Sequence, residues 1–139
     1  MNILFDASAL FKRYSGEAGI NRVLELQMLA SEITAAVHCK TEVASALTRQ
    51  WREGAFTEDE YQRVLQAIHD DFDELTVMPL SAQCERQAIA AMRLSTLRAA
   101  DALHIGCAQA AQVDLFVTAD KRQALAAQAV GLKTELIEA

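Results

Sequence analysis

The sequence has few of the residues that interrupt regular structure, with 1 proline and 5 glycines among 139 residues. It contains no stretch rich in proline, glycine or serine, no internal repeat and no low-complexity tract. We therefore predict a single domain that spans residues 1–139. A chain of this length can bury a sufficient core without disulfides.

Cysteines and long apolar runs are scarce as well. The 3 cysteines, Cys39, Cys84 and Cys107, are odd in number and far apart, which fits neither a disulfide framework nor a cysteine zinc site. The first residues lack the basic region and long apolar run of a signal peptide, and no segment reaches the roughly 18 apolar residues that span a bilayer. We expect a protein of the reducing cytoplasm with no membrane contact.

Positive charge is also in short supply, because 13 lysines and arginines face 19 acids and give a net charge of −6. This balance excludes a protein that coats nucleic acid through a uniformly basic surface. It does not exclude a nucleic-acid enzyme whose acids bind divalent cations, since bound cations would offset part of the negative charge.

Short apolar runs alternate with segments of helical periodicity. Strands are predicted at residues 2–5, 74–80, 115–120 and 133–137. Helices are predicted at residues 6–14, 19–30, 31–54 and 57–72, from Ser81 onwards, around Asp101, and at 121–131. This alternation is typical of an α/β domain with a mainly parallel central sheet flanked by helices.

Asp101 stands out because the segment around it, residues 97–111, is otherwise almost wholly apolar. Such a helix is expected to be buried on most sides, where a carboxylate is costly unless it is paired, hydrogen-bonded or coordinated to a cation. An ion pair with Arg98, three residues earlier, would contribute only about 0.2–0.5 kcal/mol. We therefore expect Asp101 to have a stronger partner.

Three further acids occupy positions that can face the same site. Asp6 and Asp120 each lie at the carboxyl end of an apolar strand, where open α/β sheets bind ligands. Glu42 lies at the border of the apolar stripe of its helix and can face inward. Simpler explanations stay open: the two aspartates are good helix caps, and Glu42 is compatible with an exposed helix surface.

Four carboxylates in one site repel one another, and they stay ionised together only when cations neutralise them. Oxygen ligands select hard ions, so we expect Mg²⁺ or Mn²⁺ at a site made of Asp6, Glu42, Asp101 and Asp120. A pair of such ions suits phosphodiester hydrolysis, because one activates water and the other stabilises the leaving oxygen.

Basic and hydroxyl side chains lie beside these acids in the sequence. The neighbouring bases are candidates to hold substrate phosphates, and they are Lys12, Arg13, Lys40, Arg98, Lys121 and Arg122. Ser8 and Thr118, each two residues from a strand-end acid, are candidates to support a metal-bound water or a phosphate. We expect His104 to pack with a satisfied ring nitrogen outside the metal site, and Trp51 and Phe56 to serve packing.

The order of the motifs FDASAL, TEVASAL, LRAADALHIGCA and LFVTADKR resembles that of a PIN domain, and more narrowly a VapC-type ribonuclease toxin of a toxin-antitoxin pair. The resemblance covers nearly the whole chain. It implies a metal-dependent endoribonuclease in which Asp6, Glu42, Asp101 and Asp120 bind Mg²⁺ or Mn²⁺, with Ser8 and Thr118 in support. It also implies an RNA substrate, a homodimer, and a cognate antitoxin that reaches into the site. The apolar helices around residues 24–29 and 47–51 would offer surface for the dimer.

Two other functions stay open at this stage. A Mg²⁺-dependent phosphatase of the haloacid dehalogenase type also has an aspartate after its first strand, but it needs a second aspartate where this chain has Ser8. The other alternative is a non-catalytic RNA-binding or protein-interaction module, in which four mutually repelling carboxylates would have no role. The sequence therefore favours a metal-dependent endoribonuclease.

Overall fold

The computed structural model describes residues 1–138, and in this range it contains seven helices and five strands. The strands are β1 (Asn2–Phe5), β2 (Glu32–Ala36), β3 (Thr76–Met78), β4 (Leu115–Thr118) and β5 (Thr134–Leu136). The helices are α1 (Ala7–Ser15), α2 (Ile20–Leu29), α3 (Cys39–Arg52), α4 (Glu58–Asp73), α5 (Ala82–Leu94), α6 (Ala99–Ala110) and α7 (Lys121–Ala129). None of the helices in this range has both the length and the apolar character to cross a membrane.

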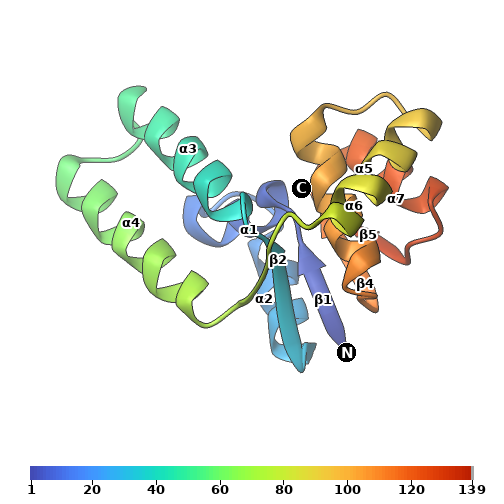
Figure 1. Ribbon diagram of the computed structural model, residues 1–139. Helices are drawn as coiled ribbons and strands as arrows, with labels where there is room; N and C mark the ends of the chain where they lie inside the picture. The colour runs from blue at the N-terminus through green and yellow to red at the C-terminus, as the bar shows by residue number, and fades with distance from the viewer. Residues whose placement is uncertain (139) are drawn as a thin grey trace.

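The strands form one parallel sheet in the order β3-β2-β1-β4-β5. Figure 1 shows β1 and β2 side by side. This confirms the α/β class and the parallel sheet that the sequence predicted. The chain moves from central β1 outward to β2 and β3, and then returns to β4 and β5 on the other side of β1. The boundary between β1 and β4 is therefore a topological switch point, where the connections diverge and leave room for a ligand at the carboxyl ends of the strands.

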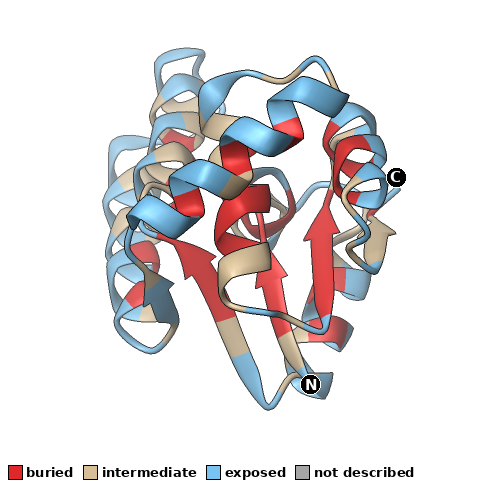
Figure 2. Ribbon diagram, turned by 45° about the vertical axis from the view of Figure 1, so that its right-hand side comes forward, coloured by how far each residue is buried: buried red, intermediate tan, exposed pale blue. Residues whose placement is uncertain are grey.

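Helices cover both faces of this sheet. Ile3 and Phe5 pack in a core with residues of α1, α2, α3 and α4, whereas Leu4 packs with residues of α5, α6 and α7. This separation follows from the alternation of side chains along a strand. Figure 2 shows the central strands buried, with exposed residues on the outer surfaces of the surrounding helices.

Helix α4 begins and packs as the sequence predicted. The Thr57 hydroxyl accepts a hydrogen bond from the N–H of Glu60, and the Glu60 carboxylate accepts one from the N–H of Thr57, which completes the capping box. Trp51 stacks on Tyr61 with ring centroids 4.9 Å apart. Phe56 packs against the core that contains buried residues of α3 and α4. These aromatic rings therefore serve packing between helices.

The prediction of one helix over residues 31–54 is wrong at its start. Residues 32–36 form β2, which pairs with β1 and β3, and α3 begins only at Cys39. The buried part of this strand contains Ala35 and Ala36 and shows no alternation of polar and apolar residues, because helices cover both faces. Pairing with two neighbouring strands overrides the helix propensity of these alanines.

Helices α5 and α6 lie close together at Gly106, which is buried in the middle of α6. A Cβ atom at this position would lie 2.3 Å from the carbonyl oxygen of Cys84 and 2.9 Å from the backbone nitrogen of Ala88. These neighbours belong to the backbone of α5, so they cannot move aside by a change of rotamer. The close contact fixes the position of α6 and thereby of Asp101.

We predict that Gly106→Ala destabilises the domain by about 1–3 kcal/mol, because the cost of overpacking exceeds the gain in helix propensity. Urea unfolding would measure the loss. A change of Ala90 to serine on the exposed surface of α5 is the control and should stay within about 0.5 kcal/mol of the wild type. An increase in stability for Gly106→Ala would show that the two helices are not in contact at this position.

Candidate active site

The four acids that were predicted to share a site line one cleft of about 560 Å³ at the carboxyl end of the sheet. Asp6 follows β1, Glu42 lies in the first turn of α3, Asp101 lies in the first turn of α6, and Asp120 immediately precedes α7. The cleft therefore collects acids from four separate parts of the chain at the switch point between β1 and β4.

Asp6 is the most deeply buried of these acids, with 4% of its surface exposed. One carboxylate oxygen accepts hydrogen bonds from the Ser8 hydroxyl at 2.7 Å and from the N–H of Ala9 at 3.0 Å, and the other accepts from the Thr118 hydroxyl. Burial raises the pKa of Asp6, and the nearby His104 and these hydrogen bonds oppose that rise only in part. The surroundings of Asp6 therefore favour neutralisation of its charge by a cation or a proton.

Ser8 and Thr118 join the ends of β1 and β4 around this carboxylate. The Ser8 hydroxyl accepts from the N–H of Ala119 at 2.9 Å, and the Thr118 hydroxyl accepts from the N–H of Asp120 at 3.1 Å. The two hydroxyl oxygens lie 3.2 Å apart. In this structure the two residues support the site by holding Asp6 and the turn that leads to Asp120.

Glu42 faces the cleft from α3 and is bound by a histidine. Its Oε1 accepts a hydrogen bond from Nε2 of His104 at 2.5 Å and lies 3.6 Å from Nε2 of His38. Burial would raise the pKa of Glu42, but the hydrogen bond from His104 and the nearby charges of His104, His38 and Arg98 lower it overall. His104 does pack with a satisfied ring nitrogen, as expected, but its partner is an acid of the site and its side chain lines the cleft.

Asp101 reaches the cleft with 23% of its side chain exposed. The ion pair with Arg98 is present, with 3.2 Å between Nε and Oδ2, but the Arg98 side chain is 85% exposed, so the pair is of the weak surface kind. The main-chain oxygen of Asp101 accepts a hydrogen bond from the buried Gln123 side chain at 2.9 Å. Asp101 thus has no strong charged partner among residues 1–138, which leaves its carboxylate available to a cation.

Asp6 and Asp120 also act as the helix caps that the sequence allowed. Asp6 caps α1 through the N–H of Ala9. Asp120 caps α7 by accepting from the N–H of Arg122 at 2.8 Å and of Gln123 at 3.3 Å. A cap uses only part of a carboxylate's accepting capacity, so capping and a position in the cleft are compatible.

Only some of the basic side chains that the sequence proposed for phosphate binding lie around the cleft. Lys12 and Arg98 line it, and so does Arg49, which sequence reasoning missed. Arg49 lies seven residues after Glu42 on the same face of α3, and this helical spacing is the signal that could have identified it. Arg122 borders a smaller adjoining cavity of about 310 Å³.

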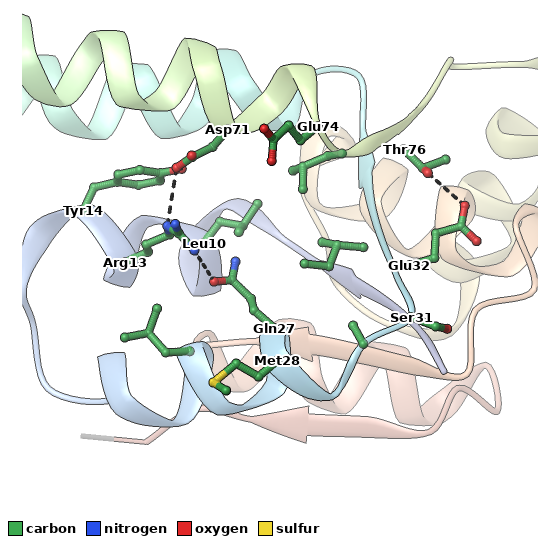
Figure 3. A pocket seen from close by; sticks show the side chains of 14 residues that line it. Leu10, Arg13, Tyr14, Gln27, Met28, Ser31, Glu32, Asp71, Glu74 and Thr76 are labelled. Carbon is green, nitrogen blue, oxygen red and sulfur yellow. Dashed lines mark hydrogen bonds and ion pairs between the residues drawn. The ribbon is translucent and has the colours of Figure 1, made fainter.

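Arg13 lies on another side of α1. Its guanidinium donates to Gln27 at 2.6 Å and lies 3.4 Å from Asp71, inside a separate depression between α2 and α4 (Figure 3). Successive residues of a helix point about 100° apart, so Lys12 and Arg13 face different sites. Arg13 therefore does not line the cleft that contains the four acids. Lys121 is exposed and lines a separate cavity of about 440 Å³ together with Lys12.

The model of the PIN domain family matches residues 3–129 of the chain. The chain belongs to the PIN domain family. Among curated proteins no match to this sequence is found.

Solved structures that share the fold of this PIN domain have little sequence in common with it. VapBC2 from Rickettsia felis, bound to a DNA fragment from their promoter, is 15% identical, with 99% and 100% of the two chains covered and a TM-score of 0.69. VapC20 from Mycobacterium tuberculosis, a sarcin-ricin loop cleaving toxin, is 16% identical, with 94% and 95% covered and a TM-score of 0.68. A toxin-antitoxin complex from Klebsiella pneumoniae is 16% identical, with 87% and 88% covered and a TM-score of 0.67.

The spacing of the acids in this PIN domain is compatible with a divalent cation that keeps part of its water. Within the described residues, the one set of three potential metal donors whose ligand atoms all lie within 4.8 Å is His38, Glu42 and His104. The aspartates are spread more widely around the cleft. Mg²⁺ commonly keeps several waters and contacts only one or two carboxylates directly, so this spacing is compatible with Mg²⁺ or Mn²⁺.

We predict that Asp6→Asn stabilises the metal-free protein by about 1 kcal/mol, or roughly 3–5 °C in Tm, because it removes a buried charge and keeps the helix cap. Thermal melts in EDTA would measure the shift. Added Mg²⁺ or Mn²⁺ should raise the Tm of the wild type more than that of the variant. A marked loss of stability in EDTA would instead assign the Asp6 charge a structural role.

Proposed function

We propose that this PIN domain is a metal-dependent endoribonuclease that hydrolyses RNA phosphodiester bonds and is the toxin of a toxin-antitoxin pair. The main support is the arrangement of Asp6, Glu42, Asp101 and Asp120 around one cleft, although they come from distant parts of the chain. The description of VapC20 as a sarcin-ricin loop cleaving toxin supports RNA as the substrate. The phosphatase alternative requires a second aspartate at position 8. This chain has a serine there, and its hydroxyl donates a hydrogen bond to Asp6.

In this proposal the four acids hold Mg²⁺ or Mn²⁺. When bound, such ions supply an activated water and neutralise charge on the phosphate group. Ser8 and Thr118 fix the Asp6 carboxylate, so that it is preorganised to bind a cation. The phosphates of the bound RNA are held by the basic side chains that line the cleft, which are Lys12, Arg49 and Arg98.

Cleavage of a mixed cellular RNA pool tests the proposed activity. We expect discrete products with Mg²⁺ or Mn²⁺, none in EDTA, and a loss of at least about 100-fold in rate for Asp6→Asn and for Asp101→Asn. The matched control is Asp73→Asn, which changes an exposed aspartate at the end of α4 outside the cleft and should keep the wild-type rate.

Thermal melts of the Asp101→Asn protein accompany this assay. The variant should be no less stable than the wild type in EDTA, since it loses only a weak surface pair. Cleavage that persists in EDTA or in the Asp6 and Asp101 variants would contradict the proposal. A complete lack of cleavage, together with no stabilisation by metal, would favour the non-catalytic binding module.

Arg49 provides a separate test of where the RNA strand lies. We predict that Arg49→Ala weakens RNA binding about equally for different sequences and reduces the salt dependence of binding by about one phosphate contact. Binding titrations at several salt concentrations would measure both effects. Arg63→Ala, on the exposed surface of α4, is the control and should change neither quantity. An unchanged salt dependence for Arg49→Ala would exclude a phosphate contact by this residue.

We also propose a cognate antitoxin and a homodimer as partners. The support for an antitoxin is that the similar structures include a toxin-antitoxin complex and VapBC2. Exposed apolar side chains offer docking surface on two helices, with Met28 87% and Leu29 64% exposed on α2 and Leu94 65% exposed on α5. Leu47, which the sequence suggested for a dimer surface, lies fully buried in the core instead.

A further inference from the structure

A second cluster of potential metal ligands overlaps the acidic cleft, which Glu42 and His104 both line. His38 immediately precedes α3, Glu42 is one turn further on, and His104 comes from α6. The two imidazole rings lie with their centroids 4.2 Å apart and are tilted by 38°. One donor atom from each of the three side chains falls within 4.8 Å of the others.

The two imidazole rings are oriented so that their Nε2 atoms face a common acceptor. Both Nε2 atoms face the same Glu42 oxygen, at 2.5 Å from His104 and 3.6 Å from His38. The Nδ1 atoms of both rings are buried and have no hydrogen-bond partner within the described residues. The contacts that orient the rings are therefore on the Nε2 side, where His38 also donates to the carbonyl oxygen of Ala100 at 2.9 Å.

The chemistry of these donors differs from that of the aspartates. Two imidazole nitrogens and one carboxylate oxygen suit Zn²⁺ and related ions such as Co²⁺, whereas Mg²⁺ prefers oxygen ligands. Three protein ligands leave a position for water or another exchangeable ligand. Glu42 is 32% exposed and His38 is 19% exposed in their side chains, so an ion can enter from the cleft side although His104 is buried.

We propose that His38, Glu42 and His104 bind a divalent ion of the zinc class, in preference to Mg²⁺. The ion would replace the hydrogen bond of His104 Nε2 to Glu42 and that of His38 Nε2 to the Ala100 carbonyl. Both Nε2 atoms would then ligate as neutral imidazoles, with the ring proton on Nδ1. Because the Glu42 carboxylate belongs to both clusters, occupation of the histidine site withdraws it from the acidic cluster. Zinc is therefore an inhibitor of the enzyme, a consequence that rests on the proposed nuclease function, whereas the binding itself does not.

Titration of the metal-stripped protein with Co²⁺ tests the site directly, because bound Co²⁺ has a visible spectrum that reports its ligands. We expect one tightly bound Co²⁺ with nitrogen and oxygen ligands, displaced by Zn²⁺ and retained in an excess of Mg²⁺. The affinity should fall about tenfold or more in His38→Ala and in His104→Gln. His69→Ala, which changes an exposed histidine of α4, is the matched control and should bind Co²⁺ like the wild type.

Three outcomes would overturn the proposal: no Co²⁺ spectrum, a spectrum that is equal in the wild type and the His38 variant, or a sulfur-to-metal band. The last would assign a cysteine ligand, for which Cys39, next to His38 in the sequence, is a candidate. Loss of Co²⁺ binding in His38→Ala is not expected to result from misfolding, because the His38 side chain is only partly buried. A melting curve of this variant would check that it is folded.

A final experiment adds Zn²⁺ to the RNA cleavage assay that contains Mg²⁺. The wild type should be inhibited, and His38→Ala should need about tenfold more Zn²⁺ for the same fractional loss of its own zinc-free rate. Equal inhibition of both proteins would exclude inhibition through this site. If the wild type cleaves no RNA at all, the proposed function fails, while the Co²⁺ titration still decides whether the ion binds.

Discussion

The buried carboxylate of Asp6 is the constraint on which the site depends. Its backbone N–H donates to the carbonyl of Val117 in β4, and its side chain accepts from Ser8, Ala9 and Thr118. One residue thus joins β1, α1 and β4 at the switch point of the sheet. The same contacts hold a charge in a place where burial disfavours it. The proposed cation in the cleft would resolve this conflict, and the other three acids lie around the same cleft.

The distribution of charge is compatible with the proposed RNA substrate, although the chain as a whole is acidic. The net charge of −6 describes the whole molecule, whereas the cleft combines its acids with Lys12, Arg49 and Arg98. Bound cations would neutralise the acids where the phosphate has to approach. Lys12, Arg49 and Arg98 would then attract the RNA backbone at distances shorter than the screening length of physiological salt.

Features with a local signal could be predicted from the sequence. The end of β1 before Asp6, the capping box at Thr57 and the apolar helix around Asp101 each depend on neighbouring residues, and the structure has them at those positions. The strand predicted to reach Asp120 ends at Thr118, and Asp120 caps α7. The strand β2 was missed because it is covered by helices on both faces and stabilised by pairing with β1 and β3, and no local pattern in the sequence records either feature. The bond between Glu42 and His104 joins residues 62 positions apart, so the sequence could not reveal it. Arg49 was within reach, because its helical spacing from Glu42 places it on the same face.

The central claim is that the cleft around Asp6 binds a divalent cation, and a crystal structure of the protein grown with Mn²⁺ tests it most directly. The anomalous signal of manganese would locate the ion independently of any activity assay. The account predicts a peak in the cleft that contacts the Asp6 carboxylate, directly or through one water, with a second acid of the cleft within reach. An empty cleft at saturating Mn²⁺, with the Asp6 contacts to Ser8 and Thr118 unchanged, would contradict the account.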